Sequence, residues 1–269
     1  MQMTASVHIQ VADRKGISFL KNAYCSTPFK VANITENKTN PLLHLMLMSS
    51  SPGILDGDQY TILIEVEKNC SLQLHTQAYQ RLFNMKTGAG QKMNVQLADG
   101  ASFSFLPHPC VPHEQSIFTS INTFYLEKNF RLVYGEILTC GRKLNGEIFL
   151  VNKYQSCNAI YLQNKLVVKE NLLLQPSLIN VKAIGQLEGY THQASMIYLQ
   201  EGIDIKTLQL QIISLLSAEI NITAGVSITP VNGLIIRILG SGAEQLYNCL
   251  QSINAILPTK PVTIIVHAA

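Results

Sequence analysis

Charged side chains are scarce in this sequence of 269 residues, where Asp, Glu, Lys and Arg make up 14% of the chain. An ordinary soluble domain has about 25%. Hydrophobic residues make up 47%, yet no apolar run reaches the roughly 18 residues that a membrane-spanning helix needs. A protein so poor in charge and so rich in apolar residues is expected to bury part of its surface against a partner protein and not in a membrane.

The charges that are present form no cluster of one sign. Twenty basic and 17 acidic residues leave a net charge of +3, so we expect no nucleic-acid partner. The N-terminal stretch lacks the apolar core of a signal peptide. The six cysteines are dispersed without a C-x-x-C pair, which favours reduced and mostly buried thiols over disulfides. These features predict a cytoplasmic protein.

Common catalytic motifs are also missing from the sequence. It contains no G-x-S-x-G, no P-loop, no G-x-G-x-x-G and no H-E-x-x-H. The absence of these signatures favours a protein that is not an enzyme.

Short runs of alternating apolar and polar residues fill most of the chain up to about residue 200. The segments 60–78, 91–107 and 158–175 each contain two such runs separated by turn residues, as at Asp99-Gly100. The Asp-Gly pair predicts a hairpin. Strands that recur this often, with no helices between them, predict a mainly β fold: a sandwich, a barrel or a β-solenoid.

The last seventy or so residues have a different pattern. Segment 204–220 places apolar residues on one helical face and has Asp204 as a candidate N-cap. Segment 241–257 does the same and begins with Ser241 and Glu244 at the spacing of a capping box. Two helices near the C-terminus are therefore predicted.

Two further strands are predicted in this region. A hairpin across Asn232-Gly233 lies between the helices, and a final strand follows at 262–267. No linker rich in Gly, Ser or Pro separates this end from the rest, so we expect a single domain over residues 1–269.

The segment 105–113, FLPHPCVPH, is a candidate metal site because it carries His108, Cys110 and His113 close together. A zinc site needs three or four ligands that converge on one point. The interspersed prolines impose an extended path, along which neighbouring side chains splay apart. We therefore favour a rigid surface turn, with weak and transient metal contact by the two histidines as the alternative.

Carboxylates form the second group of candidates. Asp56 and Asp58 lie two residues apart in a turn, where they either bind a hard cation or are simply solvated. Glu170 lies in an apolar run next to Lys169, which must point the opposite way on a strand. An acid that faces an apolar interior is costly unless it is paired or hydrated, so Glu170 indicates a polar channel or a buried pair.

Four segments, in order along the chain, resemble motifs of one protein family. SPGILDGD at 51–58 is similar to S-P-G-G-x-x-G-G-D, and 105–113 is similar to x-L-P-x-P-x-I-P-F. GEILTCGRKLNGEIF at 135–149 is close to E-x-x-x-x-G-R-x-x-x-G-E-x-F, and LIIRILG at 234–240 resembles G-L-x-x-R-x-L. Together they resemble the UreD (also UreH) family of urease accessory proteins. The residues that carry the turn and the G-R-x-x-x-G-E motif are Pro52, Gly53, Gly57, Arg142, Gly146 and Glu147.

The chain departs from the family pattern at a few positions. Ile54 and Asp56 replace glycines of the first turn, and His113 replaces the usual Phe. These departures suggest a divergent member with an altered partner surface.

The resemblance implies a specific fold and role. Family members are not enzymes; they form a β-helical, layered stack of many short strands with two helices near the C-terminus. They bind a helical UreF partner, which recruits the UreG GTPase, and the assembly docks on apo-urease. Ni²⁺ then passes through the UreD-like subunit in transit, with no tightly bound cofactor. The conduit acids of the family correspond to Asp58 and Glu170 here.

Two other interpretations remain at this point. A metal-dependent hydrolase would use Asp56, Asp58, His108 and His113, and it requires these side chains to converge. A generic β-rich interaction module would have no connection with nickel. Independently of the resemblance, Arg142 and Glu147 flank an Asn-Gly turn and predict an ion pair that joins two strands.

Overall fold

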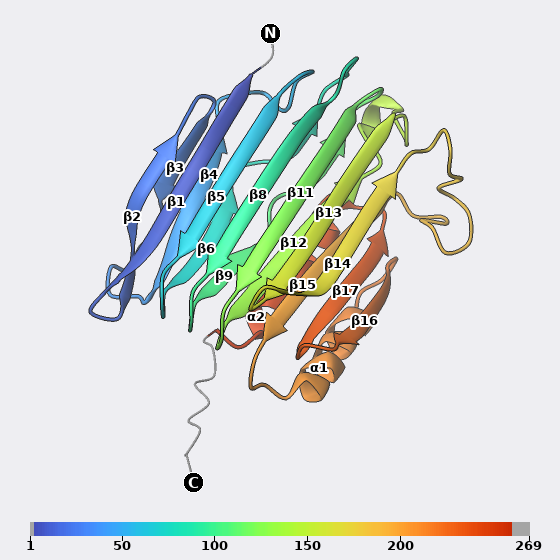
Figure 1. Cartoon of the computed structure of the whole chain (residues 1–269). Helices are drawn as coiled ribbons and strands as arrows, with labels where there is room; N and C mark the ends of the chain where they lie inside the picture. Colours follow the sequence, from blue (N-terminus) through green and yellow to red (C-terminus); the bar gives the residue numbers. More distant parts are fainter. Residues whose placement is uncertain (1–2, 260–269) are drawn as a thin grey trace.

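Alternating apolar residues fold into two stacked β-sheets in the computed structural model, which describes residues 3–259 (Figure 1). The first sheet has seven strands in the order β14-β13-β11-β8-β5-β1-β2. Its strands are β1 (Thr4–Arg14), β2 (Ile17–Cys25), β5 (Gln59–Val66), β8 (Ala89–Leu97), β11 (Ile117–Leu126), β13 (Lys153–Leu162) and β14 (Lys165–Leu174).

The second sheet has ten strands, with the main order β16-β17-β15-β12-β9-β6-β4-β3, and β7 and β10 attached beside β12. Its strands are β3 (Phe29–Asn33), β4 (Leu42–Ser49), β6 (Ser71–Thr76), β7 (Gln80–Leu82), β9 (Ser102–Phe105), β10 (Cys110–Pro112), β12 (Arg131–Thr139), β15 (His192–Gln200), β16 (Thr223–Thr229) and β17 (Gly233–Gly240). The helices are α1 (Ile205–Ser217) and α2 (Ala243–Ile256), with a short 3-10 turn at Lys143–Asn145.

The chain winds between the two sheets like a flattened coil. It runs from β4 to β5, β6, β8, β9, β11, β12 and β13, adding strands to the two sheets in turn. Successive strands within each sheet are therefore parallel, as in the pairs β5–β8, β8–β11 and β11–β13. This arrangement confirms the predicted mainly β, β-helical layered stack with two helices in the C-terminal part.

The hairpin predicted at Asp99-Gly100 is wrong. The flanking strands β8 and β9 belong to different sheets, and the turn between them is an arch from one layer to the other. Gly100 takes a positive φ of 71°, and its N–H donates to Lys128 of the next arch at 2.9 Å. Alternation is the same for a hairpin and an arch, because both leave one face of each strand on the core. The hairpin predicted at Asn232-Gly233 is confirmed by the antiparallel pair β16–β17.

The two helices cover the outer face of the second sheet around β12, β15 and β17 (Figure 1). Asp204 caps α1 as predicted, because its carboxylate accepts from the Thr207 N–H at 3.2 Å. The capping box predicted for α2 is wrong: the N-cap is Gly242, which has no side chain to bond, and Ser241 lies outside the helix. The strand predicted at 262–267 lies outside the described residues.

All six cysteines are free thiols and four of them are buried, which confirms the prediction from their spacing. Neither helix in residues 3–259 is long and apolar enough to cross a membrane.

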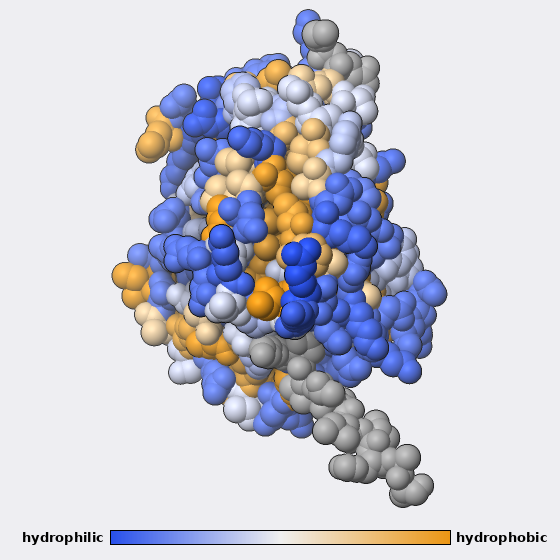
Figure 2. Space-filling view, turned by 90° about the vertical axis from the view of Figure 1, so that its left-hand side faces the viewer, coloured by the Kyte–Doolittle hydropathy of each residue, from blue (hydrophilic) through white to orange (hydrophobic). Residues whose placement is uncertain are grey.

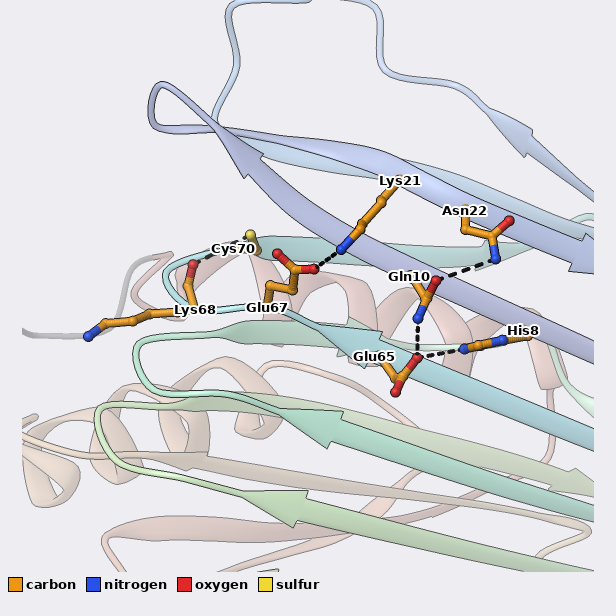
Figure 3. A network of polar contacts seen from close by, with 8 residues as sticks. All are labelled: His8, Gln10, Lys21, Asn22, Glu65, Glu67, Lys68 and Cys70. Atoms are coloured by element: carbon orange, nitrogen blue, oxygen red, sulfur yellow. Dashed lines mark hydrogen bonds and ion pairs between the residues drawn. The ribbon is translucent and has the colours of Figure 1, made fainter.

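Polar side chains join strands β1, β2 and β5 on the outer face of the first sheet (Figure 3). Glu65 accepts hydrogen bonds from His8 at 2.6 Å and from Gln10 at 2.7 Å. Lys21 donates to Glu67 at 2.7 Å. The polar side chains on this part of the outer face are thus paired with one another. Buried polar groups have to be sought in the interior between the sheets.

At the edge formed by β2 and β3, apolar side chains reach the surface. Figure 2 faces this edge and shows an apolar band along it, between more polar margins. The partly buried side chains of Leu20, Cys25, Phe29 and Val31 pack there against the core. This exposure agrees with the low charge of the chain.

Candidate functional site

A cavity of about 290 Å³ lies between the two sheets. Near its mouth it is lined by the exposed residues Pro52, Tyr79 and Arg81, together with His108. At its inner end it is lined by buried polar residues of β11 and β12, among them Asn122. The cavity therefore leads from the surface to a polar group of side chains inside a mainly apolar sandwich.

Glu136 of β12 is the centre of this group. Its Oε1 accepts hydrogen bonds from the Tyr134 hydroxyl and from the Ser156 hydroxyl, both at 2.6 Å. The Asn158 amide donates to Oε2 at 3.3 Å, and the Asn122 amide donates to Asn158 Oδ1 at 2.8 Å. Three of these donors converge on the Glu136 carboxyl group and the fourth on Asn158, so hydrogen bonds hold the polar side chains in one arrangement.

The charge state of Glu136 follows from its position. Burial raises the pKa of its carboxyl above the ordinary value of 4.5, and the hydrogen bonds from Ser156 and Tyr134 oppose this effect only in part. The side chain of Glu136 is partly accessible, because it lines the cavity. A carboxyl in the wall of a cavity that opens to the surface is able to meet a cation or a proton that enters the cavity.

Strand register extends the polar group into two facing rows. In the second sheet, Glu136 lies opposite Ser195, which lies opposite Arg237 of β17. In the first sheet, Asn122 lies beside Asn158, which lies opposite Glu170 of β14. All these residues lie on the inner faces of their strands, because apolar residues two positions away along each strand pack in the core between the sheets. The rows cross the sandwich from the cavity to its β14–β17 edge.

Glu170 lies at the end of these rows. Its Oε1 accepts from Arg237 at 2.6 Å and its Oε2 from the Ser195 hydroxyl at 3.4 Å. The Glu170 side chain is 11% exposed, whereas that of Arg237 is 61% exposed. Lys169 points outward, as predicted. The expected polar channel or buried pair at Glu170 is thus an ion pair at the edge of a polar row.

Asp58 is buried, at 2% exposure, and is not a solvated turn residue. Its Oδ2 accepts from the Tyr60 hydroxyl at 2.7 Å and from the Leu55 N–H at 2.9 Å. Tyr60 lines the cavity, so Asp58 is hydrogen-bonded to a residue of the cavity wall. Asp56 faces elsewhere and caps the backbone N–H groups of residues 87 and 88, which lowers its pKa to about 2.

The glycines of the predicted motifs allow close backbone approach or a positive φ, and Gly53 does so in the wall of the cavity. A Cβ on Gly53 would collide with the Arg81 carbonyl oxygen, so the backbone of Arg81 can come this close only to a glycine. Gly57 and Gly146 have positive φ values of 86° and 82°, which favour glycine. Pro52, next to Gly53, is exposed at the mouth.

The predicted ion pair of Arg142 with Glu147 is present. Arg142 donates to both carboxylate oxygens of Glu147, with the Nε to Oε2 bond at 2.9 Å. Glu147 Oε2 also accepts from the Glu114 N–H at 3.2 Å. The pair therefore fixes the loop that follows β10, and it joins this loop to the 3-10 turn rather than two strands as expected.

The surface turn expected at 105–113 is wrong in part. Cys110 and His113 are buried, because the segment enters the second sheet as β10. His108 and Cys110 line the cavity, and His113 does not. The His108 Nδ1 lies 2.9 Å from the Thr76 hydroxyl, and its ring stacks on Tyr247 of α2. His113 packs edge-on against Phe83.

The four residues of the hydrolase hypothesis make separate contacts and do not form one centre. Across residues 3–259, no three His, Cys, Asp or Glu side chains converge in a way that would hold a metal ion. This geometry gives no support to a metal-dependent hydrolase built on Asp56, Asp58, His108 and His113.

The sequence analysis missed Glu136, Asn122 and Asn158. One signal was available: the pattern S-x-N occurs at 120–122 and again at 156–158, each time on the inward positions of an otherwise apolar strand. In the structure the two patterns are aligned, serine beside serine and asparagine beside asparagine. Paired polar residues on core positions indicate a buried polar site.

Comparison with known proteins agrees with the motifs. The model of the UreD urease accessory protein family matches residues 3–263. Urease accessory protein UreD of Flavobacterium johnsoniae is 50% identical over 253 residues, which cover 94% of this chain and 91% of that protein. UreD of Acetivibrio thermocellus is 34% identical over 93% of this chain and 96% of its own length, and UreD of Haemophilus influenzae strain PittGG is 35% identical over 90% and 94%. The chain belongs to the UreD family of urease accessory proteins.

Proposed function

We propose that this protein is a nickel-insertion scaffold for urease, through which Ni²⁺ passes from partner proteins to the apo-enzyme. The observation that supports the proposal is the pair of polar rows that begins at Glu136 in the cavity wall and reaches Glu170 at the β14–β17 edge. Polar groups in a sandwich core are costly, and the described residues contain no cluster of His, Cys, Asp or Glu that these groups would serve as a fixed metal centre. A role in cation passage gives them a function.

The chemistry of the path suits a divalent ion in transit. Its donors are carboxylate, amide and hydroxyl oxygens, which hold such ions more loosely than a cluster of thiolates or imidazoles holds Ni²⁺. Asp58 does not line the cavity itself but accepts a hydrogen bond from Tyr60, whose side chain does, and so fixes this part of the wall. The ion is therefore cargo and not a resident cofactor, and His108 is at most a weak contact at the mouth.

The partners that we infer are a UreF-like helical protein, a UreG-like GTPase and apo-urease, all in the cytoplasm. The apolar band at the β2–β3 edge and the low charge of the chain support extensive protein contact. Co-expression of the tagged chain with the two partners, followed by size determination, is expected to give a stable complex. A monomeric chain that ignores both partners would contradict this part of the proposal.

The conduit is tested by the nickel content of urease matured in the presence of variants. Glu136→Gln, Asp58→Ala and Glu170→Ala are expected to lower the nickel per urease active site several-fold while the chain still binds its partners. Ser120→Leu, which fills the inner end of the cavity, is expected to do the same without removing a charge. Glu65→Gln on the outer face is the matched control and is expected to mature urease normally.

Wild-type nickel content with all four conduit variants would refute passage through this path. Normal urease maturation in cells that lack the protein would instead support the generic interaction module.

A further inference from the structure

Two histidines face one another on the outer face of the second sheet, away from the polar path. His44 of β4 and His75 of β6 lie on neighbouring parallel strands, and both alternate with core leucines, so their rings point away from the sandwich interior. The His44 Nδ1 and His75 Nε2 atoms are 3.3 Å apart, and the ring planes differ by 18°. Both rings are half-buried.

We propose that His44 and His75 form a surface site for one divalent first-row transition-metal ion. Two imidazole nitrogens that bind one ion at about 2.1 Å, at an angle of about 90–110°, lie roughly 3.0–3.4 Å apart. The observed separation of 3.3 Å is within this range. The rings need only turn so that both nitrogens point at the ion instead of at each other.

The protonation state of the pair suits this role. Burial lowers the pKa of both His44 and His75, and the neutral imidazole is the form that binds a metal. In the metal-free pair one ring donates an N–H to the other. When the ion binds, that proton moves to the other nitrogen of the same ring, so the exchange is a tautomer change and releases no proton.

The place of the site in the fold is informative. Thr76 follows His75 directly and is hydrogen-bonded to His108, which lines the cavity near its mouth. The proximity of His108 also contributes to the lowered pKa of His75, after burial and His44. Since the described residues offer no third His, Cys, Asp or Glu ligand, water completes the coordination, and the ion stays exchangeable.

The proposal that the pair binds a metal ion does not depend on the proposed function. The additional role of the pair, to collect Ni²⁺ before the ion enters the cavity, rests on that function.

The test uses the full chain, with any tag removed, and Ni²⁺ alone. Equilibrium dialysis is expected to show that the wild type binds a Ni²⁺ ion. His44→Gln and His75→Gln are each expected to weaken this binding about tenfold or more, because loss of one imidazole removes the chelate. His8→Gln is the matched control, a partly exposed histidine on the outer face of the other sheet. It is expected to bind as the wild type does.

A spectroscopic measurement identifies the ligands. With Cu²⁺ as the probe, electron paramagnetic resonance is expected to report two equatorial imidazole nitrogens in the wild type and in His8→Gln, and fewer than two in each pair variant. Circular dichroism confirms that the variants fold. Unchanged Ni²⁺ binding and an unchanged nitrogen count in the His44→Gln/His75→Gln double variant would overturn the proposal and leave the pair as a hydrogen bond only.

The outcomes separate this proposal from the conduit. If all four conduit variants mature urease normally but the histidine variants lose Ni²⁺, the metal site stands and the conduit fails. If the reverse is found, the conduit stands and ions enter the cavity without this site.

Discussion

Replacing Glu136 by Gln is expected to change how the stability of the protein depends on pH. Burial raises the pKa of Glu136 in the folded protein above the ordinary value of 4.5. Between these two pKa values the folded protein keeps a proton that the unfolded chain has released. The contribution of Glu136 to stability is therefore fully present below pH 4.5 and is lost as the pH rises through the folded-state pKa.

The size of the effect follows from proton linkage. In the interval between the two pKa values, the free energy of unfolding of the wild type should fall relative to Glu136→Gln by about 1.4 kcal/mol per pH unit. Gln has nearly the same shape as a protonated Glu and still offers an oxygen to Tyr134 and Ser156. The two proteins are therefore expected to differ least below pH 4.5.

The assay is urea unfolding followed by far-ultraviolet circular dichroism across this pH range and below it, where Glu65→Gln provides a control of opposite sign. Hydrogen bonds from His8 and Gln10 lower the pKa of Glu65. Its contribution is present above pH 4.5 and is lost as the pH falls through the folded-state pKa. If the wild type and Glu136→Gln give parallel stability curves from pH 4 to pH 8, Glu136 does not titrate abnormally and the reasoning about its burial is refuted.

Three further changes test the scaffold. Asp204→Ala removes the cap of α1 on Thr207 and should lower the free energy of unfolding by about 1 kcal/mol; no change in urea unfolding would contradict the capping geometry. Ile212→Ala, at a fully buried position of α1, should lower the free energy of unfolding by about 2–5 kcal/mol in the same assay. A decrease below 1 kcal/mol would mean that the helix packs loosely. Glu147→Gln should lower the melting temperature more than Arg142→Gln does, because Glu147 is the better buried partner; equal shifts would contradict this.

Much of the fold was predictable because alternation reports which face of a strand is buried. The inward positions of β5 and β8 follow directly from their sequences, as do the apolar faces of both helices. Alternation does not report which strand pairs with which, and the Asp99-Gly100 arch shows the consequence. Hairpin and arch bury the same side chains, and only long-range packing decides between them.

The site was harder to predict for a physical reason. β12 is covered by the first sheet on one face and by the helices on the other, so nearly all of its residues are buried and alternation disappears. Glu136 therefore stands in a strand without a polar face, and its sequence neighbours do not show where it points. Glu170 was recognised because β14 lies at a sheet edge, where exposed Lys169 marks the opposite face.

Register explains how such a fold carries a polar path through an apolar core. In parallel strands without shifts, residues at one level of neighbouring strands form a straight row, as Asn122 and Asn158 do across β11 and β13. Each strand supplies only one or two polar residues, such as Ser156 and Asn158 of β13, and other inward positions of the strand, such as Ile160, stay apolar. The path is therefore sensitive to register: a change that slips one strand by one residue would turn its polar side chain to the outer face and break the row.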